Sequence, residues 1–292
     1  MTAESHANVD LSVVAPAHNE EGNVAELARQ IEGALRPLGI NFEFVLVDDG
    51  STDRTGAIAM ELARERPWMR VVRMLETPAG RGNGQSAAFC AGFRASRGRL
   101  IAVLDADLQN DPGDIPAMLA LMDRQGADLV QGDRSHARAD NWARRQTSKV
   151  GRLFRRLLLG DTIRDTGCSL RVMKREVALR LPLEFKGMHR FIPATARHMN
   201  YKVVEMPVHH RVRTSGKTKY GSMGITARAI PGLIDCLAVR YMRSRRRPVR
   251  CEEPPSLTDA TNPKRERGNT EATAPRLSVD VQASFKPTES AS

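Results

Sequence analysis

Several residue types and segments are scarce in this chain, and each scarcity excludes a class of protein. Only 4% of the residues are aromatic, so the chain has few side chains on which single-stranded nucleic acid could stack. The cysteines Cys90, Cys168, Cys236 and Cys251 lie far apart without a CxxC pair or metal-ligand spacing, and we expect reduced thiols. Neither a secretory signal nor a long uncharged apolar run is evident, so we expect no membrane-spanning helix.

The composition otherwise fits a folded domain with a basic surface. The chain has 292 residues, 41% of them hydrophobic and 27% charged, and its net charge is +11. Residues 245–292 contribute only +2 of this charge, which leaves +9 on residues 1–244. Such a surface favours an anionic partner, whether nucleic acid, acidic lipid head groups or a phosphorylated substrate. We expect a flexible leader over 1–9 and a disordered tail over 248–292, which is rich in Pro, Thr, Ser and Glu.

Short apolar runs alternate with helical patterns in the first 130 or so residues. The expected strands are 11–15, 42–47, 71–75 and 100–104. Four strand–helix repeats predict an α/β fold with a mostly parallel sheet and helices on both faces. Ligands of such sheets bind at the carboxyl ends of the strands. Asp48, Asp49, Asp105 and Asp107 all follow predicted strands, so we expect them to share one site.

The segment Asp105-Ala-Asp107 is the best candidate for a metal site. Two carboxylates at this spacing after a strand can reach one divalent cation, and Gln109 offers a further carbonyl oxygen. Mg²⁺ and Mn²⁺ prefer such hard oxygen ligands and bridge diphosphate oxygens. Asp48 and Asp49 could accept hydrogen bonds from a base or a ribose. The alternative for both segments is a solvated turn, with Ser51 or Thr52 as a helix cap in the second.

Six segments in order resemble glycosyltransferase family 2, most closely its dolichol-phosphate mannosyltransferase-like and polyprenyl-phosphate group. The segments are 14–20, 45–53, 104–112, 165–171, 189–191 and 210–220. The resemblance covers about residues 10–222 and implies that this range forms one GT-A domain, a Rossmann-like sheet flanked by helices. It also implies an inverting, metal-dependent hexosyltransferase that moves mannose or glucose from a GDP- or UDP-sugar to a polyprenyl or dolichyl phosphate.

The resemblance assigns roles to individual residues. Donor-binding positions of the family correspond to Pro16, Asn19, Glu20, Asp48 with Asp49 beside it, Asp105, and Arg213 with Lys217 and Lys219. Metal positions correspond to Asp105, Asp107 and Gln109, with Mg²⁺ or Mn²⁺ as the cofactor. Acceptor-phosphate positions correspond to Arg134, Arg144 and Ser148, with Arg145 as the alternative to Arg144. Asp105, Asp107 and Arg213 would be the catalytic residues, because they stabilise the departing diphosphate.

The choice of acceptor depends on whether the chain supplies a general base. A hydroxyl acceptor needs one, whereas a phosphate is already ionised at neutral pH. Sugar-accepting relatives usually have an acidic residue near Phe191, but residues 186–193 hold no carboxylate, and His189 is the only candidate base. This favours a phosphate acceptor. The alternative is a saccharide or lipid hydroxyl acceptor, which would make His189 or an unrecognised acid essential.

Two basic segments suggest contact with a membrane surface. Residues 134–156 hold eight Lys/Arg and one acidic residue, with leucines and Phe154 on an apolar side, and predict a basic amphipathic helix. Residues 223–247 predict a second, interfacial helix, although its apolar stripe would equally suit packing against the core or a partner helix. We therefore expect a cytoplasmic enzyme, peripheral on the cytoplasmic face of a membrane, with a membrane-protein partner or a homo-oligomer as further possibilities.

Three other interpretations fit parts of the sequence. A nicotinamide-dependent oxidoreductase would share the sheet, but the turn 80–84 lacks GxGxxG. A nucleic-acid-binding module would explain the charge, but no helix-turn-helix, zinc or RNP signature is present, so we expect no nucleic-acid partner. A catalytically inactive scaffold that only binds nucleotide is disfavoured by the complete set of acidic residues.

Overall fold

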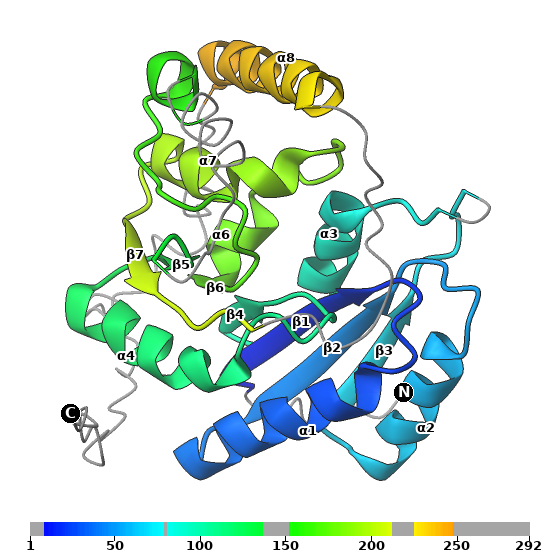
Figure 1. The fold of residues 1–292 in the computed structure, drawn as a ribbon. Coiled ribbons are helices and arrows are strands. Elements are labelled where there is room, and N and C mark those ends of the chain that lie inside the picture. The colour runs from blue at the N-terminus through cyan, green and yellow to red at the C-terminus, as the bar shows by residue number, and fades with distance from the viewer. Residues whose placement is uncertain (1–8, 79–80, 137–151, 153, 212–224, 248–292) are drawn as a thin grey trace, which may run out of the picture.

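The computed structural model describes residues 9–78, 81–136, 152, 154–211 and 225–247. Within these ranges, seven strands form a single sheet (Figure 1). The strands are β1 (Leu11–Ala17), β2 (Phe42–Asp48), β3 (Met69–Arg73), β4 (Leu100–Val103), β5 (Leu129–Asp133), β6 (Arg171–Lys174) and β7 (Val203–Pro207). Most neighbouring strands pair in parallel, so the predicted mostly parallel sheet is confirmed.

The strand order is β3-β2-β1-β4-β6-β5-β7. The first four strands are mutually parallel, as the alternating pattern predicts. β6 runs antiparallel to both β4 and β5, whereas β5 and β7 are parallel. Because β1 and β2 pair in register from Leu11 with Phe42 to Ala17 with Asp48, their carboxyl ends lie side by side. The loops that follow β1, β2 and β4 consequently meet at one edge of the sheet.

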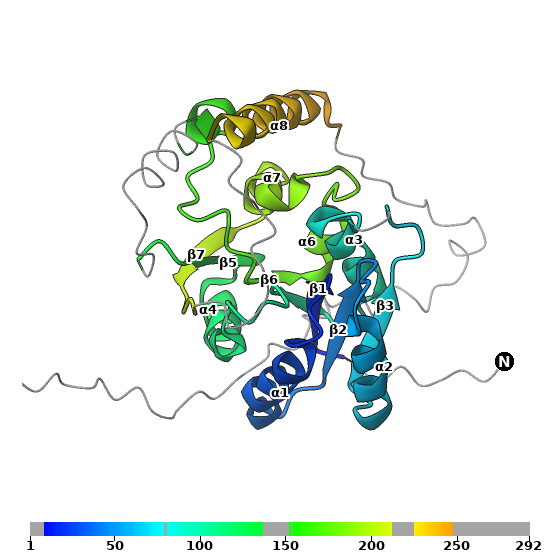
Figure 2. The ribbon, with the colours of Figure 1, turned by 45° about the vertical axis from the view of Figure 1, so that its right-hand side comes forward.

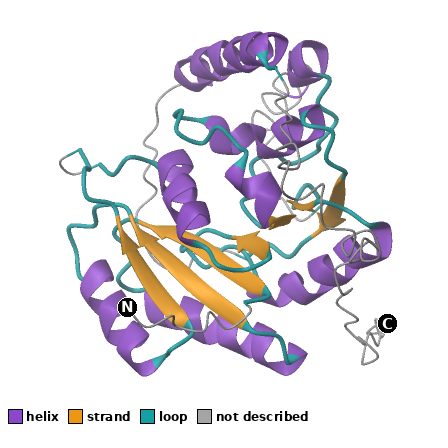
Figure 3. Cartoon of the chain, turned by 180° about the vertical axis from the view of Figure 1, so that it is seen from behind, coloured by secondary structure: helices purple, strands orange, loops and turns teal. Residues whose placement is uncertain are grey.

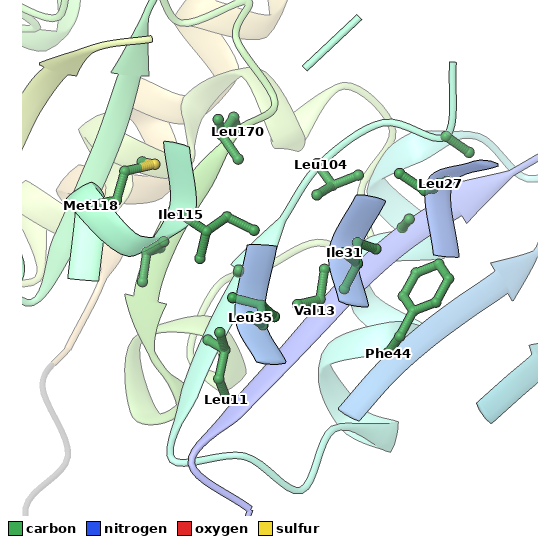
Figure 4. Close-up of a cluster of buried hydrophobic side chains, with 14 of the residues drawn as sticks. Leu11, Val13, Leu27, Ile31, Leu35, Phe44, Leu104, Ile115, Met118 and Leu170 are labelled. Carbon is green, nitrogen blue, oxygen red and sulfur yellow. The ribbon is translucent and has the colours of Figure 1, made fainter. Parts of the chain in front are cut away.

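Helices cover both faces of the sheet, and Figure 3 shows the strands between the helical layers. The α-helices of the described residues include α1 (Val24–Leu35), α2 (Thr55–Glu65), α3 (Gln85–Ala95), α4 (Ile115–Gln125), α6 (Arg175–Leu179), α7 (Ile192–His198) and α8 (Ile225–Arg245). Alternate residues of each strand point to opposite faces, so Val13 and Val14 belong to different buried clusters. α1 and α4 pack on the Val13 side (Figure 4), and α3 and α7 pack on the Val14 side.

Two of the α-helices are preceded by short 3-10 turns. A short 3-10 turn, η2 (Pro112–Asp114), precedes α4, and a second one, η3 (Met188–Phe191), precedes α7. Both α-helices carry a proline in the first turn, where its missing amide breaks no helical hydrogen bond. The prolines therefore mark where each α-helix begins, and the residues before them form the tighter turns.

The predicted amphipathic helix over 134–156 is wrong at its beginning. Arg134 follows β5 directly and lies buried, and the next two residues form a turn. Residues 137–151 and 153 lie outside the described residues, and 154–159 are helical. A basic side chain is therefore withdrawn from solvent at the start of this segment. Among the described residues, no helix has the length and apolar character needed to cross a membrane.

Two glycines give a matched test of the packing between α3 and the sheet. A Cβ atom on Gly92 of α3 would lie 2.4 Å from Cγ1 of Val14 and 3.0 Å from Cγ2 of Val47. We expect Gly92→Ala to lower the free energy of unfolding by about 1–3 kcal/mol through overpacking. Gly33 in α1 has no atom within 4 Å of such a Cβ, so Gly33→Ala should raise it by about 0.5–1 kcal/mol. Urea denaturation measures both, and a stabilised Gly92→Ala would contradict this packing.

Candidate active site

Asp105 and Asp107 lie just after β4, at the edge where β1 and β2 also end. Both carboxylate oxygens of Asp105 are held: Gln85 Nε2 donates to Oδ1 at 2.6 Å, and Ser169 Oγ donates to Oδ2 at 2.6 Å. Ser169 in turn accepts a hydrogen bond from Asn110 Nδ2 at 2.8 Å. These donors come from α3 and from the segment before β6, so the carboxylate is fixed by elements far apart in sequence.

The two neighbouring negative charges of Asp105 and Asp107 would be stabilised by a bound cation. Burial raises the pKa of Asp105, and the negative charge of Asp107 raises it further. Asp107 is 9% exposed and accepts a hydrogen bond from the amide of Gln109 at 3.2 Å. No group of three or more His, Cys, Asp or Glu with metal-binding geometry occurs among the described residues. The donor set therefore fits a hard divalent cation whose remaining ligands would be substrate oxygens or water.

The loop after β1 is fastened to the loop after β2. Asn19 has a left-handed backbone (φ 57°), and its Oδ1 accepts a hydrogen bond from the amide of Thr52 at 2.8 Å. The amide of Glu20 donates to Thr55 Oγ1 at 2.8 Å. Asp48 is buried, and its Oδ1 accepts from the amide of Ser51 at 3.0 Å. The structure thus brings the predicted nucleotide-binding residues Asn19, Glu20 and Asp48 together, with Pro16 at the end of β1 beside them.

Asp49 has a different set of contacts from its neighbour Asp48. Its Oδ1 accepts from the amide of Asn83 at 2.8 Å and its Oδ2 from the amide of Gly84 at 2.7 Å. A Cβ atom on Gly82 would lie 2.4 Å from Oδ2, so only glycine fits there. Asp49 therefore anchors the glycine-rich loop ahead of α3, and both of its oxygens already face backbone amides. These two hydrogen bonds give Asp49 a structural role, because they hold the loop beside the site.

A buried ion pair lies behind the carboxylates. Arg134 Nε donates to Asp165 Oδ2 at 2.8 Å, and both side chains are less than 10% exposed. Next to them, Arg171 is 1% exposed and donates from Nε to Gln131 Oε1 at 2.7 Å. Burial lowers the pKa of Arg171 to about 10, so it remains charged at neutral pH. The charge of Arg134 opposes the rise in the pKa of Asp105, which places Arg134 near the site, but its guanidinium is already paired with Asp165.

Sequence reasoning missed the two residues that hold Asp105. Ser169 lies in the segment 165–171, which carries part of the family resemblance, but that resemblance assigned it no role. Gln85 stands at the first position of α3, and no pattern in the sequence marks it. Gln85 lies 20 positions from Asp105 in the sequence, and Ser169 lies 64 positions from it. Only the fold brings such residues together. The predicted residues Arg144, Ser148, Arg213, Lys217 and Lys219 lie outside the described residues.

His189, the candidate general base, is engaged with α3. Its Nδ1 lies 2.9 Å from Ser86 Oγ, and its amide donates to the same oxygen at 3.1 Å. Burial, with the charges of Arg190 and Arg171, lowers the pKa of His189 to about 3. The imidazole is therefore neutral at pH 7 and a weak proton acceptor.

The depressed pKa of His189 predicts a pH-dependent stability. In the unfolded state His189 has its ordinary pKa of about 6.5 and binds a proton below that pH, whereas the folded state does not bind this proton until about pH 3. The free energy of unfolding should therefore fall as pH drops below about 6.5, by up to about 1.4 kcal/mol per pH unit from this residue. His189→Gln should flatten that slope in urea denaturation between pH 6.5 and 4. Parallel curves for the two proteins would contradict the burial of a neutral imidazole.

Comparison with known proteins adds independent findings. The family model described as Glycosyl transferase family 2 matches residues 12–181. An undecaprenyl-phosphate 4-deoxy-4-formamido-L-arabinose transferase from Edwardsiella ictaluri is 37% identical over 234 residues, which cover 80% of this chain and 70% of that protein. A dodecaprenyl-phosphate galacturonate synthase from Rhizobium johnstonii is 36% identical over 245 residues, 82% of this chain and 70% of that protein.

A solved structure shares the architecture at lower sequence identity. Glucosyl-3-phosphoglycerate synthase from Mycobacterium tuberculosis, in complex with Mn²⁺, UDP-glucose and phosphoglyceric acid, matches with a TM-score of 0.56 and 19% identity. The match covers 79% of this chain and 80% of that chain. At 19% identity, this likeness establishes a common fold only. The substrates of this chain have to be inferred from its own residues.

Proposed function

This chain belongs to glycosyltransferase family 2, and we propose that it transfers a sugar from a nucleotide-sugar donor to a polyprenyl phosphate. The family predicted from the six sequence segments is confirmed, and so is the GT-A fold. The observation that carries the proposal is the pair Asp105 and Asp107 at the carboxyl edge of the sheet, with Asp105 held by Gln85 and Ser169. Family membership also decides against the oxidoreductase interpretation.

The proposed reaction forms one bond and breaks one. An oxygen of the acceptor phosphate attacks C1 of the sugar, the bond from C1 to the diphosphate oxygen breaks, and the nucleoside diphosphate leaves with the electron pair. Attack from the face opposite the leaving group inverts the configuration at C1. The departing diphosphate gains negative charge, so fixed positive charge near it lowers the barrier.

The carboxylates of Asp105 and Asp107 would hold Mg²⁺ or Mn²⁺, with Gln109 as a further ligand. Such an ion supplies Lewis acidity to the diphosphate when bound. Gln85 and Ser169 keep the Asp105 carboxylate in one orientation, which limits the reorganisation required during the reaction. Arg213, with Lys217 and Lys219, remains the proposed counter-charge of the diphosphate. The metal complexed with the mycobacterial enzyme is Mn²⁺, which supports a divalent cation without choosing between the two.

The nucleotide would lie over the loops after β1 and β2. Pro16, Asn19, Glu20 and Asp48 meet there, and their hydrogen bonds hold the two loops in one arrangement. Asp49 supports the same side indirectly, by anchoring the loop 82–84. These contacts support a preformed binding edge for the donor.

The acceptor is proposed to be a phosphate rather than a hydroxyl. Residues 186–193 contain no carboxylate, and His189 has too low a pKa to be an efficient base at neutral pH. Both curated relatives are named for polyprenyl-phosphate chemistry, which supports the same acceptor class. Arg134, Arg144 and Ser148 are the proposed phosphate contacts. For Arg134, this requires the guanidinium to serve Asp165 and the acceptor together, for which its five N–H donors suffice.

The proposed donor is a nucleotide-activated sugar. A GDP- or UDP-hexose of the mannose or glucose type remains our prediction, although the two relatives are named for a formamido-arabinose and a galacturonate. Because the acceptor is a lipid, we place the enzyme peripherally at the cytoplasmic face of a membrane. A membrane-protein partner or a homo-oligomer is compatible with this placement.

The test is radiolabelled sugar transfer by the full chain. Polyprenyl phosphate in detergent would be offered with Mg²⁺ or Mn²⁺ and a panel of nucleotide donors of hexoses, uronic acids and amino-arabinose derivatives. Polyprenol without phosphate is the matched acceptor control. We expect label in the lipid phase with the phosphate only, and loss of that label with EDTA. Equal labelling of polyprenol would favour the hydroxyl alternative, and labelling of neither lipid with any donor would contradict the proposal.

A further inference from the structure

α8 has two apolar sides, and only one of them faces the domain. Cys236 and Val239 are about 5% exposed and belong to the cluster that contains α3 and α7. Four other large apolar side chains of the same helix are 37–62% exposed: Leu233, Ile234, Leu237 and Tyr241. At about 100° per residue, these four occupy an arc of about 100° that excludes Cys236 and Val239. One side of α8 therefore packs against the core, which is one of the predicted alternatives, and the other side is exposed.

A second helical segment extends this apolar surface. Arg240 Nη1 donates to the carbonyl of Leu158 at 2.9 Å, and Arg243 Nη1 donates to that of Leu159 at 3.2 Å. These bonds hold residues 154–159 against α8, and both views place the two segments together at one end of the molecule (Figures 1 and 2). Phe154 is 43% exposed and Leu157 68% exposed. We call Phe154, Leu157, Leu233, Ile234, Leu237 and Tyr241 the docking face.

Positive charge borders the docking face at the C-terminal end of α8 and in the neighbouring helical segment. Residues 232–247 contain five arginines and a single acidic residue, Asp235. The arginines from 240 to 247 are exposed, and Arg156 adds another exposed one from the neighbouring segment. Asp235 is directed toward the domain, because a Cβ atom on Gly187 would lie 3.0 Å from its Oδ2. The outward surface thus combines aliphatic and aromatic side chains with a basic rim.

We propose that the docking face binds the surface of an anionic lipid bilayer. Apolar side chains flanked by arginines match the boundary between acyl chains and negatively charged head groups. Between two copies, this face would offer its arginines no acidic partner from 232–247, because the single acidic residue there, Asp235, is directed toward the domain, and this disfavours self-association through the face. The inference concerns the surface alone and does not depend on which sugar is transferred. It places the lipid contact on the α8 side of the domain, where Gly187 leads into the segment that contains His189.

The test is flotation of the full chain with vesicles of phosphatidylcholine alone or mixed with phosphatidylglycerol. We expect binding to the anionic vesicles only, weakening as salt is raised. Leu233→Ser/Leu237→Ser should weaken it about tenfold or more. Replacing Arg245, Arg246 and Arg247 by Gln should weaken it by about fivefold for each arginine near the lipid surface. The control is Met60→Ser, whose side chain is similarly exposed (44%) on α2, away from α8.

The outcomes separate this inference from the proposed reaction. Asp107→Asn should bind vesicles like the wild type, and the leucine variant should still transfer sugar to acceptor in detergent. The leucine, arginine and Met60 variants should unfold at the wild-type temperature, because the residues changed in them are exposed. Equal binding of the leucine variant and the wild type would overturn the inference. So would a failure to bind anionic vesicles, or a dimer of the wild type that the leucine substitutions abolish.

Discussion

Asp107→Asn is expected to reduce the rate of sugar transfer about 100- to 1000-fold while leaving the protein folded. Asparagine keeps the size of the side chain and one oxygen that can accept from the amide of Gln109, but it removes the negative charge. The cation and, with it, the leaving diphosphate would lose a fixed ligand. The measurement is kcat/KM for label transfer over a Mg²⁺ or Mn²⁺ titration, with urea denaturation to confirm the fold.

Asp123→Asn is the matched control for this substitution. Asp123 is an exposed acid near the end of α4, so its neutralisation changes the net charge equally without touching the site. Its rate should remain within about twofold of wild type, as expected for a screened surface charge. If Asp107→Asn behaved like Asp123→Asn, the role given to the Asp105–Asp107 pair would be wrong.

Asp165→Ala is expected to lower the free energy of unfolding by about 3–5 kcal/mol, because it leaves the charge of Arg134 buried without its partner. Asp165 also accepts a hydrogen bond from the amide of Gly167 at 3.0 Å, which would be lost as well. Urea denaturation at neutral pH measures the change. Glu26→Ala is a suitable comparison, because its pair with Arg29 lies on the surface of α1, where such pairs stabilise little.

A double substitution separates the structural role of Arg134 from its proposed role in acceptor binding. Arg134→Met/Asp165→Leu removes both buried charges and should recover most of the lost stability. Transfer to polyprenyl phosphate should nevertheless remain low, with a raised KM for the acceptor, because the phosphate contact is gone. A stable double variant with a wild-type KM would contradict that contact and leave the ion pair as purely structural.

The sequence was sufficient for those features that depend on local pattern and strand order. Asp48 and Asp105 follow strands of an alternating pattern, and parallel strands bring their carboxyl ends to one edge. The antiparallel direction of β6 was not predictable in this way, because an apolar run looks the same in either direction. The same limit applies to Arg134, whose burial depends on Asp165 arriving from 31 residues further along the chain.

The contacts inside the site were beyond prediction for a related reason. Asp48 and Asp49 are adjacent and chemically identical, yet one accepts from Ser51 and the other from the loop 83–84. Successive side chains of a strand point to opposite sides. Which loop lies on each side is decided by the folded structure and cannot be read from the sequence. The resemblance to a family supplied the chemistry of the site, and the fold supplied the partners Gln85 and Ser169.

The most direct test of the central claim is the mass of the lipid product formed from one accepted donor and polyprenyl phosphate. Transfer to the phosphate predicts a product heavier than the acceptor by one sugar less one water, with nucleoside diphosphate released in equal amount. Mild acid should then release the sugar and regenerate polyprenyl phosphate. Donor consumption with an acceptor of unchanged mass would mean hydrolysis or another acceptor, and would contradict the account.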